Sequence, residues 1–276
     1  MTFLSRLRSI QKKNKSLLCI GLDTDIELVP KYFLSSANPV LEFNRRIIEA
    51  TNDLVCAYKL NLAFYEAMGN SGWQTLRDTL SFIPKSIVTI GDGKRGDIGN
   101  TAERYAEALF NDLGFDAATV NPYMGYDSVE PFLRSDKHGV FLLALTSNEG
   151  SNDFQRLNIG GKPLYERVVQ TAAKWNTKKN LGLVVGATHP DELRSIRLLA
   201  PTVPLLIPGI GKQGGDLRSA VRYGCTKRGD LAVINASRSV IYASNGKNFA
   251  AAARKEAEKL VRQIRKFQKQ VGGGRR

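Results

Sequence analysis

Apolar runs typical of β-strands alternate with helical patterns along almost the whole chain. This alternation restricts the possible folds more than any other feature of the sequence. Most of the runs are nearly all apolar, as expected for parallel strands buried on both faces. Eight strands that alternate with helices favour a single-domain (β/α)8 TIM barrel. A doubly wound open sheet is the alternative, disfavoured because no GxGxxG motif follows the first strand. The predicted strands are Leu17–Asp23, Leu54–Leu60, Ser86–Lys94, Ala117–Asn121, Gly139–Thr146, Leu181–Gly186, Val203–Ile207 and Leu231–Asn235.

Helix signals fall between the predicted strands. The clearest are a capped start at Asn38 and Pro39, a helix over Thr101–Leu113, a capped start at Thr188 and Asp191, and a helix from about Lys247 to Lys269. The last of these helices carries apolar residues at helical spacing, which we expect to be buried on one face. These residues are Phe249, Ala253, Leu260, Val261, Ile264 and Phe267.

The chain of 276 residues is 42% hydrophobic, which is enough for a sizeable core. We predict one barrel domain over residues 1–276, with an N-terminal helix over residues 1–16 and a disordered tail over residues 270–276. No apolar run approaches the ~20 residues that span a bilayer, so no membrane contact is expected. Residues 1–15 lack the apolar stretch of a secretory signal, which favours a cytoplasmic protein. Because they contain no acid and are mildly amphipathic, a mitochondrial presequence is the alternative.

The small numbers of cysteines and histidines limit the kinds of catalytic or metal site that this chain can form. The three cysteines, Cys19, Cys56 and Cys225, are odd in number and form no CxxC pair, which disfavours a disulfide framework. With only two histidines, His138 and His189, neither a histidine metal site nor a catalytic triad is expected. We therefore predict chemistry that depends on lysine and aspartate, with no metal and no cofactor.

The net charge of +14 raises the question of nucleic-acid binding. Residues 254–276 carry nine basic and two acidic side chains, and this difference of +7 is half of the total. Only Phe267 lies among these charges, whereas single-stranded nucleic acids are usually bound by interleaved aromatic and basic residues. We therefore interpret the segment as a solvated helix face and expect no nucleic-acid partner. The general positive charge would attract anionic substrates.

Polar residues close several of the predicted strands, at the end where a barrel has its active site. Asp92 and Lys94 are two residues apart in the sequence DGKRGD, so an extended backbone directs both side chains to the barrel mouth. Asp97 follows after a turn, and Lys59 ends the neighbouring strand. These residues can form an alternating array in which each ammonium keeps its charge beside carboxylates. The alternative is a ladder of salt bridges that only closes the top of the barrel.

Two further loops favour an anionic ligand. The sequence PGIGKQGGD at residues 208–216 is rich in glycine, so its backbone N–H groups can approach an oxyanion closely. The sequence NASRS at residues 235–239 contributes Arg238, whose planar guanidinium suits phosphate. Phosphate sites in barrels are often built from the loops after strands seven and eight. The alternative is a pair of flexible connections with Arg238 on the surface.

The motifs GLD, YKLN, DGKRGDIGNTA, TSNEG, PGIGKQGGD and NASR occur in this order, and together they resemble the orotidine 5′-phosphate decarboxylases. The short TSN and SR elements resemble the type 2, or bacterial, subfamily. The resemblance covers roughly residues 15–250. It implies a homodimeric TIM barrel that converts orotidine 5′-phosphate to uridine 5′-phosphate in pyrimidine biosynthesis without a cofactor.

The resemblance also implies roles for individual residues. Lys94 would protonate the C6 carbanion of the product, and Lys59, Asp92 and Asp97 would complete the catalytic array. Asp97 and Thr101 would reach in from the other subunit. The remaining expectations concern substrate binding: Asp23 and Lys59 for the ribose, Ile98, Pro208 and either Thr146 or Ser147 for the pyrimidine, and Gln213 and Arg238 for the phosphate.

Two positions depart from the family pattern. Gly93 stands where a larger residue is usual between the aspartate and the lysine, and we expect it to loosen the strand end. Ser237 precedes Arg238 where many relatives have glycine, which would hinder close backbone approach to phosphate. The rival is a Mg²⁺-dependent sugar-phosphate enzyme of the same superfamily. It is disfavoured because Lys59 stands where those enzymes have an acidic ligand, and an ammonium repels the metal.

Overall fold

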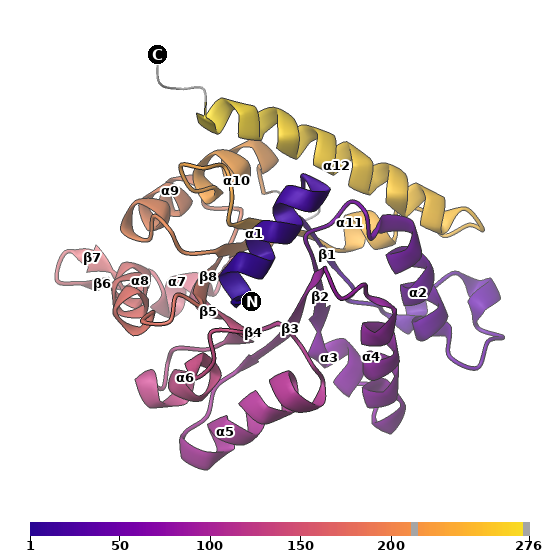
Figure 1. Ribbon diagram of the computed structural model, residues 1–276, viewed down its shortest axis with the longest axis horizontal. Helices are drawn as coiled ribbons and strands as arrows, with labels where there is room; N and C mark the ends of the chain where they lie inside the picture. The colour runs from indigo at the N-terminus through magenta and orange to yellow at the C-terminus, as the bar shows by residue number, and fades with distance from the viewer. Residues whose placement is uncertain (211–214, 273–276) are drawn as a thin grey trace.

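Parallel strands close into a barrel, as the alternation of strands and helices predicts (Figure 1). The computed structural model describes residues 1–210 and 215–272. The order around the barrel is β1-β10-β9-β8-β5-β4-β3-β2, which confirms the predicted TIM barrel. The barrel strands are β1 (Leu18–Gly21), β2 (Ala57–Asn61), β3 (Val88–Arg95), β4 (Ala117–Val120), β5 (Gly139–Leu145), β8 (Leu181–Val185), β9 (Leu205–Ile207) and β10 (Ala232–Ala236). A hairpin that the sequence did not predict, β6 (Asn158–Ile159) with β7 (Lys162–Pro163), projects from the barrel.

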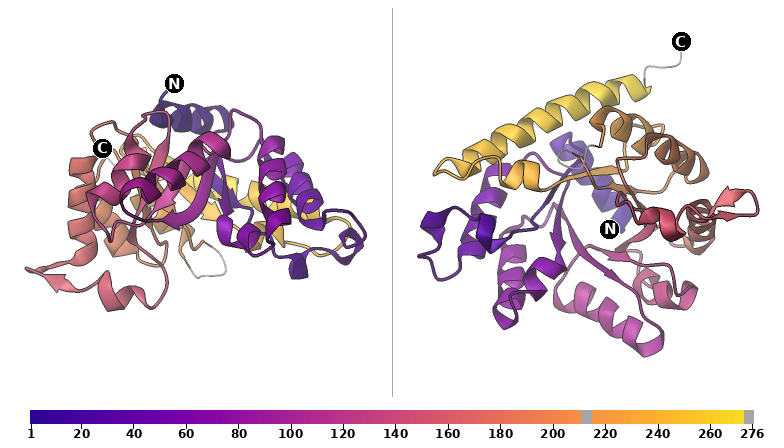
Figure 2. Two further views of the ribbon diagram at one scale, coloured as in Figure 1. Left: turned by 90° about the horizontal axis from the view of Figure 1, so that it is seen from below. Right: turned by 180° about the vertical axis from the view of Figure 1, so that it is seen from behind.

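Helices surround the barrel (Figures 1 and 2). They are α1 (Phe3–Asn14), α2 (Pro39–Thr51), α3 (Leu62–Glu66), α4 (Asn70–Phe82), α5 (Gly99–Glu107), α6 (Tyr126–Leu133), α7 (Ser151–Phe154), α8 (Leu164–Trp175), α9 (Pro190–Leu199), α10 (Leu217–Gly224), α11 (Arg238–Ile241) and α12 (Phe249–Gly272). Short helical turns are η1 (Ile26–Leu28), η2 (Lys31–Phe33) and the π-helical η3 (Ala108–Asp112).

Most helix signals of the sequence are confirmed. The side chain of Asn38 accepts the N–H of Leu41 and caps α2. The helix predicted from Thr101 begins slightly earlier, at Gly99, and ends in the π-helical turn η3. The predicted cap at Thr188 is wrong. Because Pro190 has a fixed φ that suits the first helical position and no N–H to satisfy, α9 begins there, with His189 at its N-cap.

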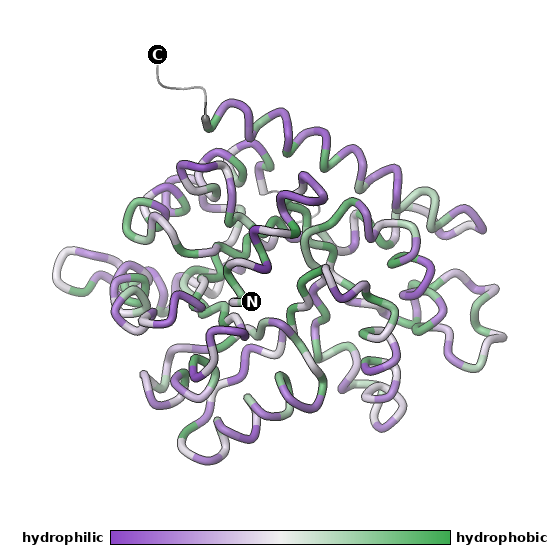
Figure 3. The backbone as a smooth tube through the Cα atoms, viewed as in Figure 1, coloured by the Kyte–Doolittle hydropathy of each residue, from purple (hydrophilic) through white to green (hydrophobic). Residues whose placement is uncertain are grey.

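The last helix follows the predicted pattern and extends it. Phe249, Ala253, Leu260, Val261 and Ile264 are all buried, and Phe267 is partly buried against the same core. The other side of α12 is hydrophilic (Figure 3). The helix continues to Gly272, so the expected tail is helical at residues 270–272, whereas residues 273–276 lie outside the described part. Within the described ranges, no helix has the length and apolarity needed to cross a membrane.

Helix α1 covers the amino-terminal end of the barrel. The ring of Phe3 meets that of Phe141 edge-on at 6.0 Å, and Gly139 is required because a Cβ there would lie 2.4 Å from the Phe3 ring. Gln11 donates its side-chain N–H to the carbonyl of Ala232 and accepts the N–H of Leu231. With this end sealed, the carboxyl ends of the strands are left for a site, and Figure 2 shows α1 on the opposite side of the barrel from the β6–β7 hairpin.

Candidate active site

A cavity of about 590 Å³ opens at the carboxyl ends of the strands. Side chains from almost every barrel strand or the loop after it contribute to its lining. Most of the residues predicted from the sequence are among them: Asp23, Lys59, Asp92, Lys94, Thr146, Ser147, Pro208 and Arg238. The polar residues predicted at the ends of the strands therefore line one continuous cavity.

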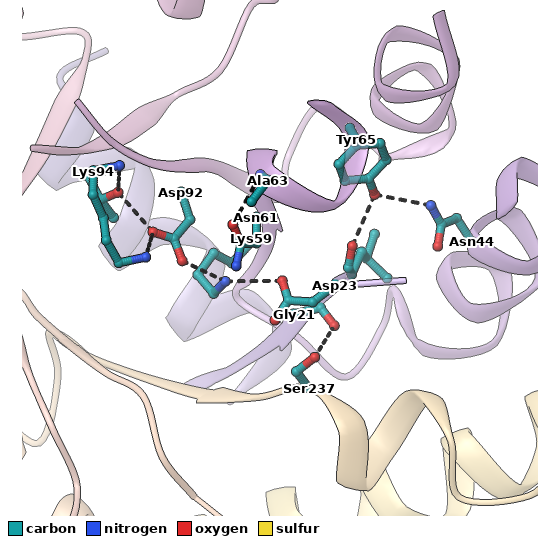
Figure 4. A network of polar contacts seen from close by, with 12 residues as sticks. Gly21, Asp23, Asn44, Lys59, Asn61, Ala63, Tyr65, Asp92, Lys94 and Ser237 are labelled. Atoms are coloured by element: carbon teal, nitrogen blue, oxygen red, sulfur yellow. Dashed lines mark hydrogen bonds and ion pairs between the residues drawn. The ribbon is translucent and has the colours of Figure 1, made fainter. Parts of the chain in front are cut away.

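The charged side chains form a continuous ladder across the cavity floor (Figure 4). The Nζ of Lys59 lies 3.2 Å from Oδ1 of Asp23 and 2.8 Å from Oδ2 of Asp92. The other oxygen of Asp92, Oδ1, lies 2.8 Å from Nζ of Lys94. The side chains of Lys59 and Asp92 are only 5% and 10% exposed, whereas that of Lys94 is 47% exposed to the cavity mouth. The ladder is therefore anchored inside the barrel and ends in an accessible ammonium.

Opposed charges keep the buried ladder ionised. Burial lowers the pKa of Lys59, but the carboxylates of Asp23 and Asp92 outweigh it and raise this pKa above its ordinary value. Burial likewise raises the pKa of Asp92, and the ammonium groups of Lys59 and Lys94 reverse this, so that the pKa of Asp92 ends well below its ordinary value. Both buried groups are thus charged at neutral pH.

The backbone that carries Asp23 is held by a buried polar network. The hydroxyl of Tyr65 donates to the carbonyl of Leu22 at 3.0 Å and accepts from Nδ2 of Asn44 at 3.1 Å. The hydroxyl of Thr24 donates to Oδ1 of Asn44 at 2.6 Å. Figure 4 shows Tyr65 and Asn44 on the side of Asp23 that faces away from Lys94. The peptide before Asp23 and the side chain of Thr24 after it are therefore held from outside the cavity.

Comparison with known proteins decides the family. The model of the orotidine 5′-phosphate decarboxylase / HUMPS family matches residues 16–255. The orotidine 5′-phosphate decarboxylase of Dehalococcoides mccartyi (strain BAV1) is 50% identical over 273 residues, which are 98% of this chain and 99% of that protein. This chain belongs to the orotidine 5′-phosphate decarboxylase family. The resemblance and the enzyme class predicted from the sequence are confirmed, and with them the place in pyrimidine biosynthesis.

Other members of the family agree over similar lengths. The orotidine 5′-phosphate decarboxylase of Christiangramia forsetii is 50% identical over 255 residues, 91% of this chain and 93% of that protein. The solved OMP decarboxylase of Leishmania donovani superimposes with a TM-score of 0.83 at 39% identity and covers 96% of this chain and 99% of that chain. The shared family therefore extends over the whole barrel, including all strands that carry the ladder.

The residues expected to act across a dimer lie outside the cavity in the single chain. The carboxylate of Asp97 accepts the N–H of Ile98 at 2.8 Å and, within the described residues, forms no ion pair with Lys94. Ile98 is 57% exposed, and Thr101 is exposed on α5. In the single chain, Asp23 rather than Asp97 is the second carboxylate of the ladder.

The loops predicted to bind phosphate are partly described. Arg238 begins α11 at the cavity rim, is exposed, and forms no ion pair within the described residues. Pro208 lines the cavity close by. Gln213 lies outside the described residues. The hydroxyl of Thr146 donates to Oδ1 of Asn148 at 2.6 Å and also contacts the amide of Gln155, so it is already engaged.

The two departures from the family pattern have local explanations. A Cβ at position 93 would lie 2.7 Å from Cδ1 of Leu62, so Leu62 of α3 fills the space that a larger residue would take. The strand β3 continues past Gly93 to Arg95, although its pairing with β4 is irregular there. The hydroxyl of Ser237 donates to the carbonyl of Gly21 at 3.0 Å, which ties the end of β10 to β1 (Figure 4).

Sequence reasoning missed Thr119, which lines the cavity beside Asp92 and Lys94. Its hydroxyl contacts both residues. The only sequence signal is a threonine in the predicted strand Ala117–Asn121, and a buried threonine is common in strands. Only the strand order, which sets β4 beside β3, reveals the contact.

Proposed function

We propose that this chain decarboxylates orotidine 5′-phosphate to uridine 5′-phosphate, with Lys94 as the proton donor. The observation that supports this most directly is the ladder, whose accessible end is the ammonium of Lys94. The C6–carboxylate bond breaks, CO₂ leaves, and the electron pair stays on C6. The ammonium of Lys94 then gives its proton to C6, and the next cycle begins once Lys94 is reprotonated.

The chemistry requires preorganised charge because the carbanion at C6 is of the vinyl type. No ring carbonyl delocalises this charge well, so stabilisation must be electrostatic. Lys59 and Lys94 flank Asp92 at 2.8 Å, so the position of the ammonium at Lys94 is set before the substrate binds. Its attraction for the developing charge therefore needs little reorganisation.

Repulsion between Asp92 and the substrate carboxylate contributes a smaller part. Two such charges ~4 Å apart interact by about 4 kcal/mol at an effective dielectric constant near 20. This corresponds to several hundred-fold in rate if it is fully expressed, well below the acceleration that such a reaction needs. Stabilisation of the carbanion by Lys94 supplies the larger part.

The cavity lining suggests how the rest of the substrate binds. Asp23 and Lys59, which line the cavity, would bind the ribose hydroxyls, and Pro208 with Thr146 or Ser147 would contact the pyrimidine. Ile98 would complete the pyrimidine pocket from the other subunit. Arg238 and Gln213 would bind the phosphate, whose binding energy holds the closed, dry site in which the ladder acts.

Replacing Arg238 with alanine should lower kcat/KM for orotidine 5′-phosphate by about 10- to 100-fold, the value of one charge-assisted hydrogen-bonding group. The fold should be unaffected because the Arg238 side chain is exposed. Steady-state kinetics and a thermal melt check both statements. Arg222→Ala, an exposed arginine in α10 outside the cavity lining, is the control. An unchanged kcat/KM would remove Arg238 from the phosphate site.

A homodimer would complete the site. Large apolar side chains are exposed in the loop after β3 and near the start of α6: Ile98 at 57%, Tyr123 at 85%, Met124 at 44% and Tyr126 at 47%. Such a cluster is suited to burial against a second copy of the chain. Asp97 and Thr101 lie beside it, so the dimer would bring them to the partner's cavity.

A metal-dependent sugar-phosphate enzyme remains the rival function. Its acidic ligand would stand on β2, where Lys59 lies between two carboxylates and opposes a divalent cation. The decisive assay mixes the purified protein with orotidine 5′-phosphate and follows the loss of orotate absorbance. We expect the same rate with and without a chelator. Activity that the chelator abolishes would favour the rival, and no activity in either case would refute the proposed function.

A further inference from the structure

We propose that Thr119 is a positioning residue of this site, whose single hydroxyl orients both the carboxylate of Asp92 and the backbone of Lys94. The inference rests on the proposed function, because the two residues that Thr119 contacts form the accessible end of the ladder. Thr119 lies on β4, is 1% exposed as a whole residue, and lines the cavity.

The contacts of the Thr119 hydroxyl leave it little freedom. Its Oγ1 donates to Oδ1 of Asp92 at 2.9 Å and accepts the backbone N–H of Lys94 at 2.9 Å. A hydroxyl has one proton to donate, and here it is committed to the carboxylate. The direction of donation is therefore set by its two neighbours on β3.

The backbone of Lys94 requires such an acceptor. The pairing of β3 with β4 is irregular between Gly91 and Arg95, and Lys94 has a φ of 46°, a left-handed conformation that residues other than glycine rarely adopt. An N–H at such an irregularity is left without its regular strand partner. The Thr119 hydroxyl accepts this N–H and so stabilises the conformation from which the Lys94 side chain enters the cavity.

The carboxylate of Asp92 is fixed by three donors. Oδ2 accepts from Lys59, while Oδ1 accepts from both Lys94 and Thr119. Without Thr119, the carboxylate can rotate about its terminal bond and move Oδ1, and with it the ammonium of Lys94. A displacement of about 1 Å in a reacting group costs on the order of 10²-fold in rate. Thr119 would thus act on catalysis through Asp92 and Lys94 without touching the substrate.

The same strand pair offers a matched control at its other end. There the hydroxyl of Thr89 donates to Oδ2 of Asp116 at 3.2 Å and accepts the backbone N–H of Asp116 at 3.1 Å. Thr89 is buried on β3 near the amino-terminal end of the barrel. Thr89→Val therefore removes a similar buried threonine–aspartate contact away from the cavity, and it reports the purely structural effect of such a loss.

The test compares Thr119→Val, which keeps the shape and loses the hydroxyl, with Thr119→Ser, which keeps the hydroxyl. Thr119→Val should lower kcat by about 10- to 100-fold. The KM for orotidine 5′-phosphate and the inhibition constant of uridine 5′-phosphate should stay within about threefold, because Thr119 is not a binding group. Thr119→Ser should keep kcat within about fivefold of the unsubstituted chain, and Thr89→Val should lower only the melting temperature.

Either of two results would overturn the inference: a kcat for Thr119→Val equal to that of the unsubstituted chain, or an equal loss in Thr119→Val and Thr119→Ser. Should Thr119→Val fail to fold, Thr119→Ala is measured in its place. The criterion stays the same: kcat should fall while KM stays nearly unchanged. An unsubstituted chain that does not decarboxylate the substrate would count against the proposed function itself. An active chain with an unaffected Thr119→Val would count against Thr119 alone.

Discussion

Replacing Lys94 with alanine is expected to lower kcat by at least about 10⁴-fold, while the chain still folds and binds uridine 5′-phosphate. The substitution removes the group that we propose donates the proton and stabilises the carbanion, and each of these effects is typically worth about 10² to 10³ or more in rate. The side chain is 47% exposed, so little buried surface is lost. Asp92 keeps its contacts with Lys59 and Thr119.

A matched control separates chemistry from backbone effects. Lys179 is also exposed and also has a positive φ, 57° compared with 46° at Lys94, but it precedes β8 at the amino-terminal end of the barrel. Lys179→Ala should therefore affect the backbone as Lys94→Ala does and leave kcat unchanged. The measurements are kcat from orotate absorbance and product affinity from calorimetry. Near-normal turnover by Lys94→Ala would refute its role.

The second large effect is expected from Asp97. Replacing it with alanine should lower kcat by about 10³-fold, because the ammonium of Lys94 would lose one of two carboxylates proposed to orient it. In the single chain, however, the Asp97 carboxylate contacts only the neighbouring N–H of Ile98 among the described residues. Under the proposed dimer, the expected loss of activity depends on a second subunit, and this can be tested separately.

Mixed dimers show which subunit supplies Asp97. Lys94→Ala and Asp97→Ala chains, each nearly inactive, are mixed in equal amounts and allowed to exchange subunits. In a mixed dimer, one site combines an intact Lys94 with the intact Asp97 of the other chain. Because about half of the dimers are mixed, about a quarter of the original activity should return. No recovery, despite subunit exchange shown by differently tagged chains, would mean that Asp97 does not act across the interface.

The barrel and the charged strand ends could be predicted because both follow from local periodicity. Nearly all-apolar runs indicate parallel strands, and the two-residue spacing of Asp92 and Lys94 places both side chains on one face. The structure confirms that they face one cavity together with Lys59. These charged residues lie at the ends of two predicted strands, and this can be seen in the sequence without knowing which strands are neighbours.

Other features could not be predicted because they depend on contacts between distant segments. The role of Thr119 follows from the irregular pairing of β3 with β4, and nothing in the sequence around Thr119 marks it. The space at Gly93 is explained only by Leu62 on another element. The cap predicted at Thr188 is wrong for a local reason, because Pro190 constrains the start of the helix more strongly than the capping pattern does.

The central claim is that Lys94, at the accessible end of the ladder, donates the proton without a cofactor. Its most direct test is the exchange of the C6 hydrogen of uridine 5′-phosphate in D₂O. By microscopic reversibility, the group that protonates the C6 carbanion also removes the proton from C6. We predict that the unsubstituted chain introduces deuterium at C6, as detected by NMR, and that Lys94→Ala does so no faster than buffer. Equal exchange by the two proteins would contradict the account.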